Sequence, residues 1–100
     1  MGDRVSIQFK KRDELSVVLF AHWGGMDFVF EAKKYAEKLK SRKETTVTDP
    51  LSRCEPSTVM VDFISRVVGK GKRIDSNYYI VATEEEGDNS DNGHHIISLD

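Results

Sequence analysis

The chain has 100 residues, of which 38% are hydrophobic and 9% aromatic, and its net charge is -2. These totals are typical of one globular domain and exclude a disordered chain. Cys54 is the only cysteine, so an internal disulfide and a cysteine zinc cluster are both excluded. No run approaches the roughly 20 apolar residues of a membrane span, and no signal peptide is evident, so we expect a cytoplasmic protein. A monomer is also expected.

The charges are distributed unevenly along the chain. Residues 1–73 hold all 15 lysines and arginines together with 10 acidic residues, whereas residues 74–100 hold seven acidic residues and no base. The net charge predicts neither nucleic-acid nor membrane binding, but this division indicates one basic and one acidic region in which a function could lie.

Two strands are expected near the N-terminus. In residues 4–10, "RVSIQFK", the apolar residues Val5, Ile7 and Phe9 alternate with polar ones, which predicts a half-buried strand. Residues 15–22, "LSVVLFAH", are apolar at nearly every position and predict a central strand covered on both faces. The short polar stretch between them favours a hairpin.

A helix is expected after the glycine pair Gly24–Gly25. Asp27 is a candidate cap or first-turn acid before residues 28–43, "FVFEAKKYAEKLKSRK". Its apolar face comprises Phe28, Ala32, Tyr35, Ala36 and Leu39. Phe30 lies on the polar side, where an aromatic residue is either incidental or an anchor for a partner.

A second helix is expected over residues 57–69, with Ser57 as its candidate cap and Gly69 at its end. Its apolar residues have helical spacing: Met60, Phe63, Ile64, Val67 and Val68. Residues 44–56 contain both prolines and are interpreted as a connection within the domain.

The last two strands are expected at residues 77–83 and 94–100, joined as a hairpin by the acidic stretch between them. The element order is then ββααββ in a single domain, residues 1–100. The predicted fold class is α+β: a four-stranded, mainly antiparallel sheet with two helices packed on one face. The pattern does not determine the order of the strands.

The acidic stretch "EEEGDNSDNGHH", residues 84–95, carries five carboxylates and no base. If a hairpin holds its ends together, like charges about 6 Å apart repel by roughly 0.7 kcal/mol per pair in water, and a divalent cation would relieve that repulsion. Calcium suits such oxygen ligands, and magnesium is the alternative with more water retained. The predicted ligands are Glu84, Glu85, Glu86, Asp88, Ser90, Asp91 and Asn92.

Residues 88–93, "DNSDNG", also match the opening of an EF-hand loop. The last position of that loop falls on Leu99 instead of glutamate, so an EF-hand proper is excluded. Weak calcium binding remains predicted, with a dissociation constant on the order of 10⁻⁴ to 10⁻³ M. The alternative is a solvated turn, because Gly, Asn, Asp and Ser are ordinary turn residues.

Other candidate sites are less specific. His94 and His95 are adjacent and point to opposite faces of a strand, so a transition-metal site would need His94, His22 or distant acidic residues to converge. The stretch "AHWGG", residues 21–25, could receive an anion or line a cleft with His22 and Trp23, but it has no phosphate-loop motif. No nucleophile motif occurs, so enzymatic activity is the less favoured interpretation.

The segments "LFAHWGG" and "DNGHHIISLD" carry a family resemblance. The first is similar to a strand-turn-helix signature of small uncharacterised prokaryotic and phage proteins. The ββααββ plan with its acidic loop resembles small uncharacterised archaeal α+β proteins, some of which have cation-binding acidic patches. The resemblance implies a fold and carries over no catalytic residue.

An interaction module is the alternative function. The first helix has a basic face that could meet a protein partner or, less favoured because aromatic residues are not interleaved, a nucleic acid. This face comprises Lys33, Lys34, Lys38, Lys40, Arg42 and Lys43, to which Lys70, Lys72 and Arg73 could add.

Overall fold

A computed structural model of the chain describes residues 3–41, 55–70 and 77–100. Most of the expected connection between the helices, including Cys54, lies outside the described residues, as do the basic residues Arg42, Lys43, Lys72 and Arg73. No helix in the described ranges has the length and apolar character needed to cross a membrane.

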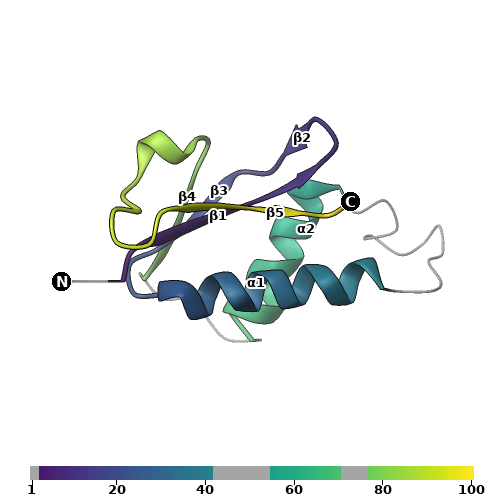
Figure 1. The fold of residues 1–100 in the computed structure, drawn as a ribbon, viewed down its shortest axis with the longest axis horizontal. Coiled ribbons are helices and arrows are strands. Elements are labelled where there is room, and N and C mark those ends of the chain that lie inside the picture. Colours follow the sequence, from purple (N-terminus) through teal and green to yellow (C-terminus); the bar gives the residue numbers. More distant parts are fainter. Residues whose placement is uncertain (1–2, 42–54, 71–76) are drawn as a thin grey trace.

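The sheet is built around β1 (Val5–Lys11) (Figure 1). On one side β1 pairs antiparallel with β2 (Glu14–Leu15) and β3 (Val18–Ala21), which confirms the first hairpin. On its other side β1 pairs in parallel with β5 (His94–Ser98), while β4 (Tyr78–Val81) pairs antiparallel with β3. The mainly antiparallel sheet with two helices confirms the α+β fold class.

The expected strand over residues 15–22 is interrupted at Ser16. The backbone N–H of Ser16 donates to the carbonyl oxygen of Phe9 over 2.9 Å, and the N–H of Phe9 donates to the Ser16 hydroxyl over 3.0 Å. The side chain thus takes the place of a backbone acceptor, and the strand divides into β2 and β3. Such a local bulge is not visible in a hydrophobic pattern.

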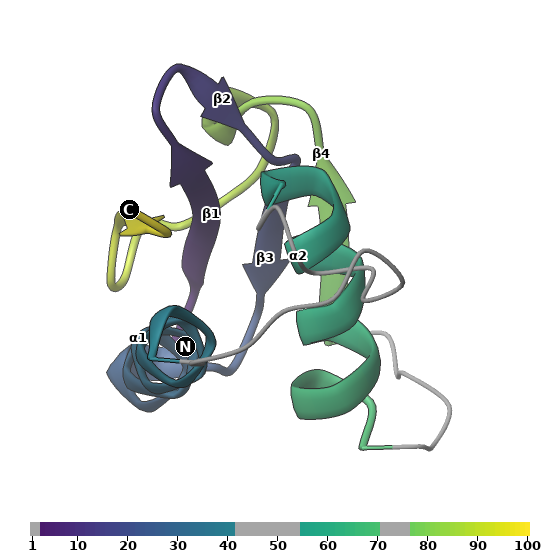
Figure 2. The same cartoon turned by 90° about the vertical axis from the view of Figure 1, so that its right-hand side faces the viewer.

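The prediction that the last two strands form a hairpin is wrong. β4 and β5 lie at opposite edges of the sheet, because β4 pairs with β3 and β5 pairs with β1. Residues 82–93 cross from one edge to the other on the side of the sheet opposite the helices, with a short 3₁₀ turn, η2 (Glu84–Glu86), on the way (Figures 1 and 2). We call this segment the crossover.

The crossover changes the environment of β1. Ser6 is fully buried and Gln8 is 8% exposed, although the alternation predicts that they face water. The prediction of a half-buried strand is therefore wrong, because both faces of β1 are covered. The prediction that the next strand is central is confirmed, since all of β3 is buried.

Both helices lie on the other face of the sheet (Figure 2). The first, α1 (Gly25–Lys40), begins before the expected start, and Asp27 lies in its first turn without acting as a cap. The second, α2 (Pro56–Phe63), has Glu55 at its N-cap, so the assignment of Ser57 as the cap is wrong; proline at the first helical position fits the start observed. It continues as a π-helical turn, η1 (Ile64–Val68), that ends at Gly69.

The core lies between the helices and the sheet. The ring of Phe63 on α2 is central to it, with ring centroids 5.5 Å from Phe9, 5.3 Å from Tyr35 and 6.0 Å from Phe28. Tilted and edge-to-face contacts of this kind add to the gain from burying the rings. The remaining buried apolar residues of this cluster are Val5, Ile7, Leu19, Ala21, Val29, Ala32, Ala36, Leu39, Val59, Met60, Ile97 and Leu99.

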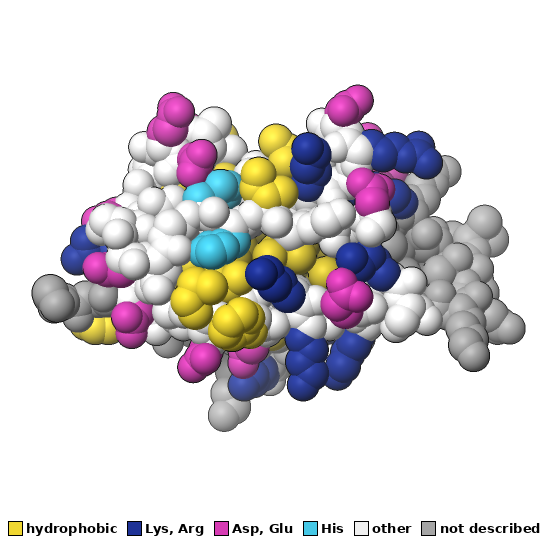
Figure 3. Space-filling model, viewed as in Figure 1, with side chains coloured by type: hydrophobic (Ala, Val, Ile, Leu, Met, Phe, Trp, Pro, Cys, Tyr) yellow, Lys and Arg dark blue, Asp and Glu magenta, His cyan; other side chains and the backbone are white. Residues whose placement is uncertain are grey.

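Several large apolar side chains remain exposed. Phe30 is 57% exposed on α1, Ile96 is 53% exposed on β5, and Ile80 is 55% exposed on β4. Figure 3 shows the side of the molecule on which β5 and α1 lie: histidine and hydrophobic side chains gather there beside basic and acidic ones.

Replacing Phe63 by alanine should destabilise the fold by about 3–5 kcal/mol, because the cavity would adjoin three other aromatic rings. Urea denaturation followed by circular dichroism would measure the loss. The control is Val61→Ala on the same helix, since Val61 is 68% exposed and its truncation should change the free energy of unfolding by less than about 0.5 kcal/mol. Equal losses in both variants would contradict the assigned core.

Candidate functional site

The structure separates the predicted calcium ligands into two groups. Glu84, Glu85 and Glu86 form the exposed η2 turn, while Asp88, Ser90, Asp91 and Asn92 lie farther along the crossover. Within the described ranges, no three His, Cys, Asp or Glu side chains lie close enough to hold a metal ion together. The carboxylates are therefore not gathered as the hairpin interpretation requires.

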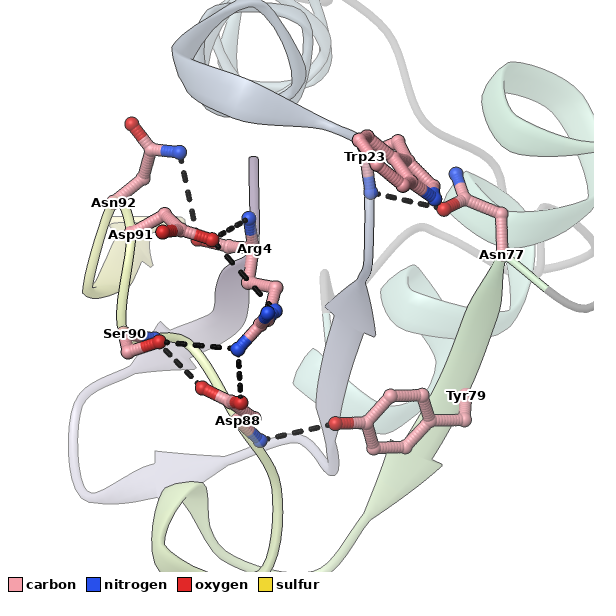
Figure 4. Close-up of polar contacts among 8 residues, drawn as sticks. All are labelled: Arg4, Trp23, Asn77, Tyr79, Asp88, Ser90, Asp91 and Asn92. Carbon is pink, nitrogen blue, oxygen red and sulfur yellow. Dashed lines mark hydrogen bonds and ion pairs between the residues drawn. The ribbon is translucent and has the colours of Figure 1, made fainter. Parts of the chain in front are cut away.

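Arg4, immediately before β1, binds both aspartates of the crossover (Figure 4). Its Nη1 lies 2.5 Å from an Asp88 oxygen, and its Nε lies 3.7 Å from an Asp91 oxygen. The Arg4 backbone N–H also donates to the Asp91 carboxylate over 3.0 Å, and the Asn92 N–H donates to the Arg4 carbonyl over 2.9 Å. We call this group the Arg4 clasp.

Asp88 is also engaged within the crossover. The Ser90 backbone N–H donates to its other carboxylate oxygen over 3.0 Å, forming an Asx turn. This bond, the Ser90 hydroxyl and the Arg4 guanidinium lower the pKa of Asp88 below its usual 3.8, so the carboxylate stays ionised in the folded state. A cation at this position would have to replace Arg4.

The Arg4 clasp changes how the acidic residues of the crossover are interpreted. The cation that neutralises Asp88 and Asp91 comes from the chain itself, across more than 80 residues of sequence. The premise of crowded, uncompensated carboxylates is thus wrong for these two residues. Calcium binding itself stays a prediction, and the exposed glutamates of η2 are its remaining ligands.

The crossover packs closely against the sheet at Gly87. A Cβ built there would lie 2.6 Å from the Phe20 ring, so only glycine lets the backbone approach this closely. Phe20 in turn stacks on Tyr79 with ring centroids 5.0 Å apart, and the Tyr79 hydroxyl accepts the Asp88 N–H over 3.0 Å. The crossover therefore has a fixed position on the sheet.

A chain of polar side chains lies beneath the crossover. The Ser6 hydroxyl is 2.7 Å from His94 Nδ1, and the Asn89 amide donates to the same hydroxyl over 2.9 Å. His94 Nε2 is 3.1 Å from Gln8 Oε1, and the Gln8 amide donates to the Ser16 carbonyl.

All these contacts are satisfied at once by one assignment of protons. Ser6 donates to Nδ1, and a neutral His94 with its proton on Nε2 donates to Gln8. Burial lowers the pKa of His94 below its usual 6.5, and the charge of His95 lowers it further against the opposing effect of Glu84. The neutral form of His94 is therefore favoured in the folded protein.

The Ser6–His94 contact resembles a nucleophile and its base, but its position excludes that role. Ser6 is fully buried, so its hydroxyl is inaccessible to a substrate. We assign the pair to the packing of the crossover on the sheet. His22 is not part of this group; its ring instead lies 5.2 Å from that of Tyr79.

The glycine pair at the start of α1 is held by backbone and side-chain hydrogen bonds from neighbouring segments. The Gly25 N–H donates to the Asp3 carbonyl over 2.9 Å, and the Trp23 N–H donates to the Asn77 side chain (Figure 4). Gly25 has a φ of +60°, which is why a glycine occupies this turn. With Asp3 beside it, this turn is not arranged to receive an anion.

A surface that the sequence did not predict lies between β5 and α1. A groove there is lined by Lys33, Ala36, Glu37, Lys40, Ile96, Ile97 and Ser98. β5 is an edge strand, because no other strand in the described parts of the chain pairs with its outer side. The sequence pattern favoured a hairpin of β5 with β4, so this open edge could not be recognised. We call the outer side of β5 with this groove the β5 surface.

No family model, curated protein or solved structure matches the chain. The resemblance to small archaeal and prokaryotic proteins therefore stays an expectation from the sequence.

Removing the clasp should favour calcium. In Arg4→Gln, Asp88 and Asp91 lose their cation, and we expect millimolar calcium to shift the amide resonances of residues 84–93 more than in the wild type, with a dissociation constant on the order of 10⁻³ M. Arg4→Lys keeps the charge and is the control. No calcium response in Arg4→Gln would refute a cation site in the crossover.

The free energy of unfolding should decrease as the pH falls below neutral, because of His94. Its pKa is lower in the folded than in the unfolded state, so its contribution is fully present above pH 6.5 and is lost as the pH falls through the lowered folded-state value. Urea denaturation at several pH values between 7 and 5 should give a smaller slope for His94→Gln than for the wild type. Equal slopes would show that another group titrates.

Proposed function

We propose that this protein is a non-enzymatic protein-interaction module that binds an extended segment of a partner along the β5 surface. In this mode of recognition, a partner strand adds to the sheet through main-chain hydrogen bonds, and side chains beside the strand give selectivity. The observation that carries the proposal is the open edge of β5.

The backbone groups that face outward can be identified from the pairing of β5 with β1. The Ser6 N–H donates to the Gly93 carbonyl, and the Leu99 N–H donates to the Lys10 carbonyl. Because the direction of these groups alternates along a strand, odd-numbered residues of β5 bond to β1. The N–H and C=O groups of His94, Ile96 and Ser98 therefore point away from the sheet and are available to a partner strand.

β5 lacks the features that usually prevent pairing at a sheet edge. Such edges are commonly protected by charged residues, proline or a bulge. The sequence of β5 is "HHIIS", with no lysine, acidic residue or proline, and Ile96 is 53% exposed. These features support binding of an apolar or uncharged strand at this position.

The groove beside β5 carries charged side chains that a bound segment could contact. Lys33 and Lys40 line its α1 side, and they belong to the basic face that the sequence predicted. Glu37 lies between them and forms an ion pair with Lys40 over 3.0 Å. Exposed pairs of this kind contribute little to stability, so these side chains can rearrange toward a partner. Lysines at both ends of the groove favour acidic residues in a bound segment.

Selection of peptides from a displayed random library tests this function. We expect extended peptides with apolar or uncharged residues in the paired stretch and acidic residues beside it, with micromolar affinity, because main-chain pairing and a few side chains contribute. Ile96→Lys should weaken their binding by about tenfold or more, which corresponds to about 1.4 kcal/mol.

Ile80→Lys on β4 is the matched control, because Ile80 is 55% exposed on the opposite edge strand. Amide hydrogen exchange should also show protection of His94, Ile96 and Ser98 by a selected peptide. Failure to select any peptide that protects these amides, or equal loss of binding in the two variants, would contradict the proposed function.

A further inference from the structure

We infer that the strand that binds the β5 surface is β5 of a second copy of this chain, so that two copies form a symmetric dimer with a continuous sheet. This inference rests on the proposed function, because it names the partner of the same surface. It replaces the monomer expected from the sequence. Two features support it: the symmetry of the strand and the charges of α1.

The outward backbone groups of β5 are arranged symmetrically about Ile96. In an antiparallel pair related by a two-fold axis at Ile96, this residue faces Ile96 of the second copy, and His94 faces Ser98 of the second copy. All three outward residues then form hydrogen-bonded pairs, as an antiparallel ladder requires. The exposed Ile96 side chains would meet across the axis, and such cross-strand apolar contacts stabilise a sheet.

The same two-fold axis brings the outer side of α1 against the outer side of α1 from the second copy, and the two surfaces are complementary. Its exposed residues are spaced alternately by four and three positions and form one stripe: Met26, Phe30, Lys33, Glu37 and Lys40. This is the spacing at which two helices pack side by side. Helix α1 runs in the same direction as β5 and lies next to it (Figures 1 and 2). The two-fold axis therefore places the two α1 helices side by side and antiparallel.

The charges of the stripe match in that arrangement. Lys33 and Glu37 are one helical turn apart and both line the groove beside Ile96. Antiparallel pairing centred between them sets Lys33 opposite Glu37 of the second copy, and Glu37 opposite Lys33 of the second copy. One contact is thus made twice by symmetry, which is the property of an isologous interface.

The same symmetry gives a role to Phe30. This side chain is 57% exposed, which is unusual for an aromatic residue on a charged helix face. In the antiparallel pair it lies opposite Lys40 of the second copy, whose aliphatic stem can cover the ring while its ammonium group stays in water. Both the aromatic residue Phe30 and the charged residues of the stripe thus contact residues of the second copy.

Sedimentation velocity over a range of protein concentrations tests the dimer. The wild type should sediment as a dimer at high concentration. Ile96→Lys places two lysines across the axis and should raise the dimer dissociation constant by about tenfold or more. Ile80→Lys, on the opposite edge strand, should leave it unchanged. Circular dichroism of both variants would confirm that the fold is kept.

A charge exchange identifies the α1 contact. Lys33→Glu sets two glutamates against each other in both symmetric contacts and should weaken the dimer by about tenfold, since like charges facing across an interface are strongly unfavourable. The double variant Lys33→Glu with Glu37→Lys restores opposite charges and should recover most of the affinity. Lys34→Glu, outside the stripe, is the matched control and should have no effect.

The outcomes separate the two proposals. A wild type that remains monomeric, or a dimer lost in Ile80→Lys but kept in Ile96→Lys, overturns the dimer at β5. If that monomer still binds a selected peptide at His94, Ile96 and Ser98, the proposed function stands and another protein is the partner. If neither a second copy nor a peptide protects these amides from exchange, both proposals fail.

Discussion

The parallel pairing of β5 with β1 is the constraint from which the rest of this structure follows. β4 ends at one edge of the sheet and β5 begins at the other, so residues 82–93 must cross a face of the sheet. Once the crossover lies there, Ser6 and Gln8 of β1 become buried, and each needs a polar partner because an unpaired buried polar group is costly. His94, Asn89 and Ser16 supply those partners.

The acidic composition of the crossover has a structural explanation in the same constraint. A segment without strand pairing needs fixed attachment points, and Asp88 and Asp91 provide two of them by binding Arg4. Gly87 provides a third, because its backbone lies so close to the Phe20 ring that any side chain would clash with it. Charge density along a sequence is therefore a weak guide to metal binding when a cation from elsewhere in the chain can reach the carboxylates.

Much of the fold could be predicted from local patterns, and the errors came from long-range pairing. Helical spacing correctly identified the buried sides of α1 and α2, since Phe28, Ala32, Met60 and Phe63 all lie in the core. No local pattern indicates that β5 pairs with β1 instead of β4, because loop composition is similar for a hairpin and a crossover.

The Arg4 clasp and the open edge of β5 both depend on the pairing of β5 with β1 instead of β4. Arg4 gave no signal in the sequence as a partner of Asp88, and the outward groups of Ile96 would have been hidden in the expected hairpin. The residues that carry the proposed function can be read from the sequence, but the strand pairing that leaves their backbone groups exposed cannot. Phe30 is the exception, because helical spacing alone places this aromatic residue on a polar helix face and so identifies it as a candidate anchor.

The placement of β5 beside β1 also affects how the chain can fold during synthesis. β1 is made well before the strand that pairs with its second side, residues 94–98, so that side of β1 stays unpaired until those residues have left the ribosome. Contacts between residues so distant in sequence slow folding, because a long loop must close before they form. Until then, Val5, Ile7 and Phe9 lie on a strand with one unpaired side, and such unpaired edges with exposed apolar side chains make a partly folded chain prone to aggregation.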